Sequence, residues 1–208
     1  MKIINKNFTP AKINNFSRSY NTKKKTSAIP QDKISFSGTI IKRVQSKEEI
    51  KEVLDLFYNS LKHNLEPNKN TPKFLEKIDR YLSLLPFSIA SRQPNCITEV
   101  VKNENKLAGG YSMIVNSENY TAHIGFITLA PEYIKTKSGI EVLKNIGRRI
   151  YENANLNNVK EITLTTNSKN KSINNLLKRL GAEKVNEIVL GETKYKISIN
   201  NLKNNLYK

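Results

Sequence analysis

Residues 123–139 read HIGFITLAPEYIKTKSG, and this stretch determines the fold that the sequence predicts. Its first half completes a strand expected over residues 120–130, which β-branched and aromatic side chains favour and Pro131 ends. A basic turn follows, and apolar residues at helical spacing then predict a helix over about 138–153. The start of that helix presents backbone amides and the positive end of its dipole, which is an arrangement that binds anions.

Strand and helix patterns alternate on both sides of this stretch. Short polar turns join the three strands that end at residue 130, which predicts an antiparallel meander. We therefore expect one mixed α+β domain over residues 37–200. Its other expected elements are a strand at 39–44, helices at 47–62 and 71–86, strands at 97–102 and 107–116, a strand at 159–165, a helix at 169–180, and a hairpin at 185–190 and 195–199.

The chain is strongly basic, with 35 Lys and Arg against 18 Asp and Glu among 208 residues, a formal net charge of +17. Residues 1–36 contain eight basic side chains and one acid, and their polar composition predicts a disordered basic leader. Residues 201–208 are expected to form a polar C-terminal tail. A charge this large attracts polyanions such as nucleic acid, an acidic membrane surface or a phosphorylated cofactor. The lysines are scattered rather than placed on one stripe, which favours a solvated surface as the interpretation for most of them.

Other features of the sequence exclude several classes of protein. A single cysteine, Cys96, excludes a disulfide framework and a Cys-rich zinc site, and no metal site is predicted. No run of eighteen apolar residues predicts a membrane span, and no secretory signal pattern is present, so a cytoplasmic location is expected. The motifs of P-loop NTPases, zincins and α/β-hydrolases do not occur.

Two parts of the sequence resemble the GCN5-related N-acetyltransferase (GNAT) superfamily. Pro131-Glu132-Tyr133 is similar to the corner that follows the central strand in that family, and Gly139 is similar to the last glycine of its phosphate-binding turn. Asn170 and Gly181 match the two ends of the family's next helix. The resemblance runs from about residue 38 to residue 199.

The resemblance implies a mostly antiparallel, twisted central sheet with helices on both faces. It also implies an acyltransferase that moves an acetyl group from acetyl-CoA to a primary amine by direct attack. The residues that it places at the cofactor are Ile127, Thr128 and Leu129 along the pantetheine arm, Lys135, Lys137, Ser138 and Gly139 at the diphosphate, and Asn170.

Three positions depart from the family's pattern. Ile134 stands where the phosphate turn usually has Arg or Gln, Lys137 replaces its first core glycine, and Leu177 stands where a Tyr often protonates the leaving thiolate. An alternative hypothesis follows from these departures. The chain would then be a catalytically degraded binding module that uses its basic surface to bind nucleic acid, a ribosome or a protein partner.

Two residues are candidates for the general base. His123 lies eight residues before Pro131, where many GNAT enzymes carry a glutamate, and imidazole titrates near neutral pH. Glu99 lies on a neighbouring predicted strand and is the second candidate. Each has a plain alternative as a strand residue without a catalytic role. The acceptor and the oligomeric state stay open, although the net positive charge disfavours polycationic acceptors such as polyamines.

Overall fold

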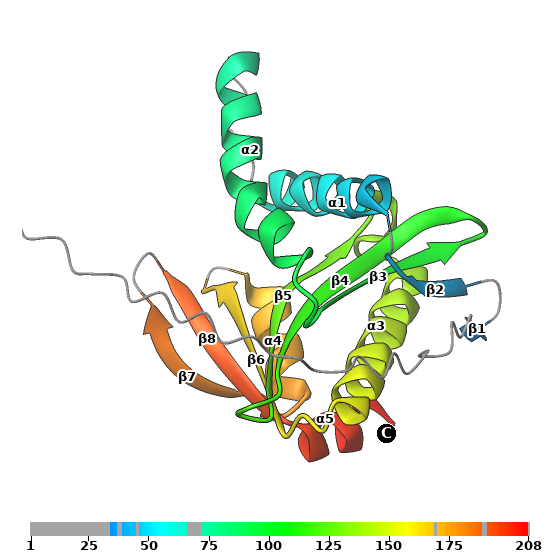
Figure 1. Cartoon of the computed structure of the whole chain (residues 1–208), viewed down its shortest axis with the longest axis vertical. Helices are drawn as coiled ribbons and strands as arrows, with labels where there is room; N and C mark the ends of the chain where they lie inside the picture. The colour runs from blue at the N-terminus through cyan, green and yellow to red at the C-terminus, as the bar shows by residue number, and fades with distance from the viewer. Residues whose placement is uncertain are drawn as a thin grey trace, which may run out of the picture. The chain divides into compact units, whose positions relative to one another are not determined.

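The computed structural model describes residues 34–36, 39–44, 46–65, 72–168, 170–188 and 191–207. They form an eight-stranded sheet with helices on both faces (Figure 1). The strands are β1 (Ile34–Phe36), β2 (Thr39–Arg43), β3 (Cys96–Asn103), β4 (Lys106–Asn116), β5 (Thr121–Leu129), β6 (Glu161–Asn167), β7 (Glu183–Ile188) and β8 (Glu192–Ser198). The α-helices are α1 (Lys47–Leu65), α2 (Lys73–Ala90), α3 (Lys137–Leu156), α4 (Lys171–Arg179) and α5 (Ile199–Leu206).

The strands lie in the order β1-β2-β3-β4-β5-β6-β8-β7. Every neighbouring pair is antiparallel except β5 and β6, which run parallel because α3 carries the chain back across the sheet between them. The predicted α+β fold with a mostly antiparallel sheet is confirmed. Strand β1 occupies the last residues of the predicted leader, and residues 1–33 lie outside the described part of the chain.

A β-bulge interrupts β5 at Gly125. Ser112 of β4 pairs with Phe126. Met113, the next residue along β4, pairs with Ile124, so Gly125 is an extra residue in β5. Side chains along a strand point to alternate faces, and one extra residue reverses that alternation. Ile124 consequently belongs to the core on the α3 face, whereas Phe126, two residues later, belongs to the core on the α1 face.

Each face of the sheet has its own hydrophobic core. On one face, Val142, Ile146 and Ile150 of α3 pack against the central strands. On the other face, Phe57 of α1 stacks on Phe126 of β5 with ring centroids 4.7 Å apart. The sheet is therefore covered in its centre from both sides, as Figure 1 shows for α1 and α3.

Helix α2 differs from its prediction in two ways. We expected it to end at Pro86, but it continues to Ala90. Pro86 lies on the exposed side, and Phe87 anchors the last turn against Phe57 with ring centroids 5.0 Å apart, which holds the helix together without the proline N–H. Its apolar stripe also faces outward, since Phe74 and Tyr81 are 70% and 66% exposed.

No helix among the described residues is long and apolar enough to cross a membrane.

The C-terminal residues form a docked helix where the sequence predicted a polar tail. Ser198 caps the start of α5 by accepting a hydrogen bond from the N–H of Asn201. Leu202 is 5% exposed and belongs to the α3 core, and the Asn205 carboxamide donates to the carbonyl of Leu180. The sequence-based division missed this helix because only one side chain in two turns is fully buried.

Replacing the buried leucine of α5 tests this docking. Leu202→Ala is expected to lower the free energy of unfolding by about 2–4 kcal/mol, because it removes buried methyl groups and leaves a cavity. Leu156→Ala is the matched control, since Leu156 is 69% exposed and its loss is expected to change stability by less than about 0.5 kcal/mol. Urea unfolding measures the free energy of unfolding of both variants, and equal decreases would contradict the docked position of α5.

Candidate donor and acceptor site

The site is organised around the place where β5 and β6 stop pairing. The two strands pair over four residues each, and the last described pair is Ile124 with Leu164. β5 continues to Leu129 and β6 to Asn167. Each strand therefore has a backbone edge beyond that pair which the other strand does not use. We call residues 125–129 the unpaired edge of β5.

Ile127 and Leu129 direct their backbone groups toward this edge. The N–H of Ala130 donates to a carbonyl of β4, with N···O 2.9 Å. Successive strand residues alternate in the direction of their backbone groups, so Thr128 also faces β4. Its carbonyl oxygen lies 2.7 Å from the position of a Cβ on Gly109 of β4, as that alternation requires. The N–H and C=O groups of Ile127 and Leu129 thus point away from β4.

The chain leaves β5 through a turn that starts α3. Pro131–Tyr133 form a single 3-10 turn, and Lys135 follows with a φ of 62°. Thr136 is the N-cap of α3. Its hydroxyl donates to the carbonyl of Tyr133 and accepts from the N–H of Gly139, each with a donor–acceptor distance of 2.9 Å. Thr136 was not among the predicted site residues, although a threonine two residues before a predicted helix is a capping signal.

The start of α3 presents free donors and positive charge together. The amides of Lys137 and Ser138 have no acceptor among the described residues, as is normal for the first turn of a helix. The first turn contains no acidic residue, and Lys135 and Lys137 are exposed. These groups add to the positive end of the helix dipole, so an anion is stabilised at this position.

Gly139 serves the turn itself. A Cβ on Gly139 would lie 1.9 Å from the carbonyl oxygen of Tyr133, a distance that no side chain allows. Its N–H is already taken by Thr136, so the amides left for a phosphate group are those before it. We expected Gly139 to give a cofactor room, and the structure instead explains this glycine by the closeness of the turn.

Asn170 and Leu177 lie beyond the other strand of the pair. Asn170 follows β6 and is the N-cap of α4, where its side-chain oxygen accepts from the N–H of Ile173 at 3.3 Å. Leu177 is 6% exposed, and its apolar side chain cannot protonate a thiolate. Of two other tyrosines considered for that proton, Tyr133 accepts a hydrogen bond from Asn103 and Tyr151 packs against the ring of Tyr207.

His123 lies on β5 two residues before the bulge, on the face opposite Ile124 and therefore on the α1 side of the sheet. Its Nδ1 lies 3.1 Å from the hydroxyl oxygen of Thr163 on β6. That hydroxyl donates its one proton to the carbonyl of Ala122 at 3.3 Å, so it accepts from the N–H at Nδ1. This assignment leaves Nε2 of His123 with a lone pair.

The surroundings of His123 favour the neutral imidazole. Partial burial lowers its pKa, and the nearby charge of Lys194 on β8 lowers it further. A neutral imidazole with a free Nε2 can accept a proton near neutral pH. Thr128, on the same α1 face, is 2% exposed and its hydroxyl has no hydrogen-bond partner among the described residues.

Glu99, the second candidate base, is in a closed network and is not suited to that role. The carboxylate is 2% exposed and lies beneath α3. Arg149 of α3 contacts both of its oxygens, at 2.7 and 3.1 Å. The Tyr111 hydroxyl donates to Glu99 at 2.8 Å and accepts from the Asn153 carboxamide at 2.7 Å. A carboxylate with both oxygens engaged and almost no access to solvent cannot take a proton from an acceptor.

The contacts within this network determine which protonation states Tyr111 and Arg149 adopt. Burial, together with the charge of Glu99, raises the pKa of Tyr111 well above its usual value, so the phenol stays protonated and donates. Burial opposes the charge on Arg149, but hydrogen bonds and charge from Glu99 and Glu152 outweigh it and raise the pKa of Arg149. The sequence analysis missed Arg149 and Asn153, although both point to the same side of a predicted helix at i and i+4 spacing.

Comparison with solved structures identifies this architecture as the GNAT fold. The N-acetyltransferase PaiA from Thermoplasma acidophilum, in complex with coenzyme A, superposes with a TM-score of 0.60 at 15% identity, covering 77% of this chain and 98% of that one. Spermidine N-acetyltransferase from Vibrio cholerae, in complex with CoA and spermine, gives 0.56 at 15% identity, with 81% and 99% covered. An acetyltransferase from Streptococcus agalactiae gives 0.56 at 15% identity, with 78% and 99% covered.

At this level of identity the likeness establishes the fold. No family model matches the sequence, and no curated protein matches it. The fold that the resemblance of residues 131–133 and 139 implied is thus confirmed by the arrangement of helices and strands.

The buried ion pair provides a test of how α3 is held. Arg149→Met leaves the Glu99 carboxylate buried without its partner, so we expect the free energy of unfolding to fall by about 3 kcal/mol. Lys144→Met is the control on the same helix, because Lys144 pairs with Glu141 in the open and contributes less than about 0.5 kcal/mol. Chemical denaturation measures the free energy of unfolding of both variants, and equal losses would mean that the buried pair does not hold α3.

Proposed function

We propose that this chain is an acetyltransferase that moves an acetyl group from acetyl-CoA to a primary amine by direct attack. The observation that carries the proposal is the combination of the unpaired edge of β5 with the anion-binding start of α3. The strand edge offers amide and carbonyl groups to an extended chain, and the helix start lies directly after it. Acetyl-CoA has the matching order of groups, with amides in its pantetheine arm and a diphosphate beyond them.

The donor is proposed to bind along β5 as an added strand would. Ile127 and Leu129 would hydrogen-bond the pantetheine amides through their backbone, since their N–H and C=O groups face away from β4. The side chain of Thr128 would contribute to the site from the α1 face of the sheet. The diphosphate would accept hydrogen bonds from the amides of Lys137 and Ser138, with Lys135 adding charge. Gly139 would support this site because it allows the turn at the start of α3. Asn170 would support it as the N-cap of α4, the helix that follows β6.

The acceptor is proposed to approach from the α1 side, where His123 lies. The neutral amine attacks the thioester carbonyl, the carbon–sulfur bond breaks, and the thiolate leaves. The proton lost by the amine passes to Nε2 of His123, directly or through one water molecule. No tyrosine occupies the position of Leu177, so the thiolate takes its proton from solvent. The low pKa of this thiolate makes it an adequate leaving group.

The class of acceptor is narrowed by charge. The Vibrio cholerae neighbour acts on spermidine, which is a polycation. This chain carries a net charge of +17, which repels polycations at long range. We therefore propose a primary amine of low charge, and a cytoplasmic location is part of the same proposal. The alternative of a binding module for nucleic acid rests on the departures from the family's pattern at Ile134, Lys137 and Leu177 and on the overall charge.

A variant at the start of α3 tests the donor site. Ser138→Asp places a negative charge in the first turn, which helix α3 tolerates or prefers but a diphosphate does not. We expect acetyl-CoA binding to weaken by about tenfold or more while the melting temperature stays equal or rises. Calorimetry measures the binding, and ATP is the polyanion control.

Ser138→Asn is the matched neutral variant and should bind acetyl-CoA nearly as the parent does. Unchanged binding in Ser138→Asp would place the diphosphate elsewhere. Equal binding of ATP and acetyl-CoA would contradict the proposed donor and support a nonspecific polyanion surface instead.

His123 makes a separate prediction about pH. NMR titration should give the imidazole of His123 a pKa below the usual 6.5, because burial and Lys194 disfavour its charged form. Lys194→Gln should raise that pKa, and the acid limb of the rate of acetyl transfer should move to higher pH with it. Lys203→Gln, a charge change on α5, should move neither.

His123→Gln should lower the rate on the plateau by about 100-fold and remove the limb that Lys194→Gln displaces. A rate profile that is unchanged in His123→Gln would exclude His123 as the base.

A further inference from the structure

A second polar pocket lies on the other side of α4 from the proposed donor site. Lys171, Asn174 and Lys178 share one side of α4 at i, i+3 and i+7, and they line a pocket of about 460 Å³ together with residues of β7 and β8. Ile173 and Leu177 lie on the opposite side of the helix, toward the core. Helix α4 therefore separates this pocket from the unpaired edges of β5 and β6.

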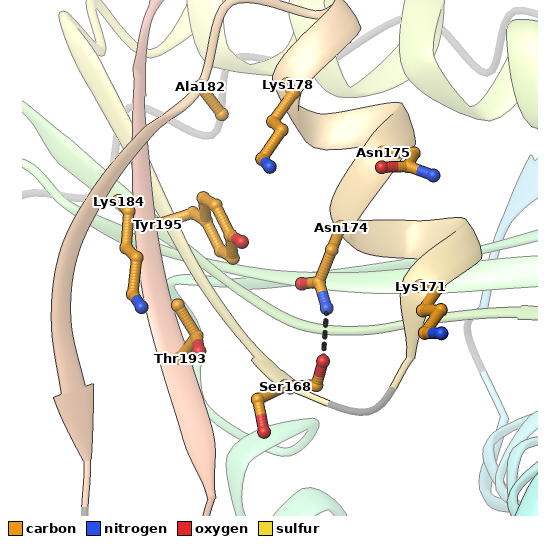
Figure 2. A pocket seen from close by; sticks show the side chains of 9 residues that line it. All are labelled: Ser168, Lys171, Asn174, Asn175, Lys178, Ala182, Lys184, Thr193 and Tyr195. Atoms are coloured by element: carbon orange, nitrogen blue, oxygen red, sulfur yellow. Dashed lines mark hydrogen bonds between the residues drawn. The ribbon is translucent and has the colours of Figure 1, made fainter.

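Two residues of β8 place side-chain hydroxyl groups at the floor of the pocket. Tyr195 and Thr193 of β8 are 4% and 2% exposed, and both line the pocket. Neither hydroxyl hydrogen-bonds to any described residue. Figure 2 shows the Tyr195 ring extending from β8 toward α4 with its oxygen at the tip. A hydroxyl group that faces a pocket without a partner in the protein is available to donate to a bound ligand or accept from it.

Asn174 adds an acceptor whose direction is fixed. Its Nδ2 donates to the carbonyl oxygens of Asn167 and Ser168, at 3.3 and 3.0 Å. The opposite atom, Oδ1, is buried and has no hydrogen-bond partner among the described residues. In Figure 2 this oxygen points toward Tyr195. A ligand that satisfies this oxygen must offer it a hydrogen-bond donor.

The charge at the pocket is positive. Three lysines line it, and the described lining residues include no carboxylate. Lys171 and Lys178 form no ion pair with any described residue. Figure 2 shows the Lys178 ammonium directed across the pocket toward β8. The ligand is accordingly an anion that can accept several hydrogen bonds at once.

We propose that this pocket binds a small phosphate ester that carries a hydroxyl group. The phosphate would accept from Tyr195, Thr193, Lys171 and Lys178, and the hydroxyl would donate to Oδ1 of Asn174. The volume is within the range of small-molecule sites and exceeds what a bare ion fills. Inorganic phosphate is the minimal form of this ligand because it retains an O–H at neutral pH. Sulfate has the same shape but no proton to donate.

Calorimetry on the full chain tests the proposal with inorganic phosphate, sulfate and glycerol 3-phosphate as probes. We expect glycerol 3-phosphate and phosphate to bind, and sulfate to bind at least about fivefold more weakly than phosphate because it leaves Asn174 unsatisfied. The Ser138→Asp variant should keep the phosphate binding that depends on Tyr195, because this change acts only on the anion site at the start of α3, and the two sites are thereby distinguished. Equal affinities for phosphate and sulfate, or no binding at 10 mM, would overturn the proposal.

Tyr195→Phe makes the test specific to the pocket. The variant removes one hydroxyl that has no partner, so the melting temperature of the ligand-free protein should not fall. Phosphate affinity should fall by about tenfold. Lys178→Gln should weaken binding similarly, and Lys106→Gln, which removes an exposed charge on β4, should not. Full phosphate affinity in Tyr195→Phe would overturn the proposal whatever the other variants show.

Discussion

Pairing between β5 and β6 stops at Ile124, the residue directly before the bulge in β5. A bulged strand bends and twists more strongly than a regular one, so β5 turns away from a parallel neighbour that runs straight on. The backbone edge beyond that point has no partner in the sheet. The turn at Thr136 and the start of α3 follow directly after it. The unpaired strand edge that leads to the start of α3 therefore depends on one local irregularity.

Helix α3 must hold a fixed orientation for its first turn to face that edge. Apolar contacts from Val142 to Ile150 fix its position over the sheet but are tolerant of rotation. The contacts of Arg149 with Glu99, and of Asn153 with Tyr111, have defined directions and are buried. We infer that this network sets the rotation of α3 about its axis. The glutamate considered as a base thus contributes to the site by positioning a helix.

The order of elements was predictable from sequence because periodicity and turn residues record it. The two faces of β5 were not, since HIGFITLA contains no signal that Gly125 is an extra residue other than the glycine itself. Side-chain pairing was also hidden, because Glu99 and Arg149 are 50 positions apart and nothing in either segment marks them as partners. Helix α5 was missed for a related reason, as its packing depends on a groove that other elements build.

The features of the candidate site were likewise only partly predictable from the sequence. Ile127 and Leu129 were named for their backbone groups, and strand geometry alone determines the direction in which those groups point. Gly139 and Asn170 have local roles, in a turn and a cap, that compete with contacts to a cofactor. The hydroxyl groups of Thr193 and Tyr195 gave no signal, because alternating residues in a strand look alike whether their face meets a core or a pocket.

The bulge also determines how this sheet responds to a change in chain length. The pairs on either side of Gly125 involve adjacent residues of β4, so loss of that one codon would leave every cross-strand partner of β5 in place. The strand would become regular, and β6 could continue alongside it. Such a chain would keep its helices, its cores and its sheet order, and would close the edge on which a substrate can lie. In this architecture one extra residue determines whether the edge of β5 is open to a substrate or paired with β6.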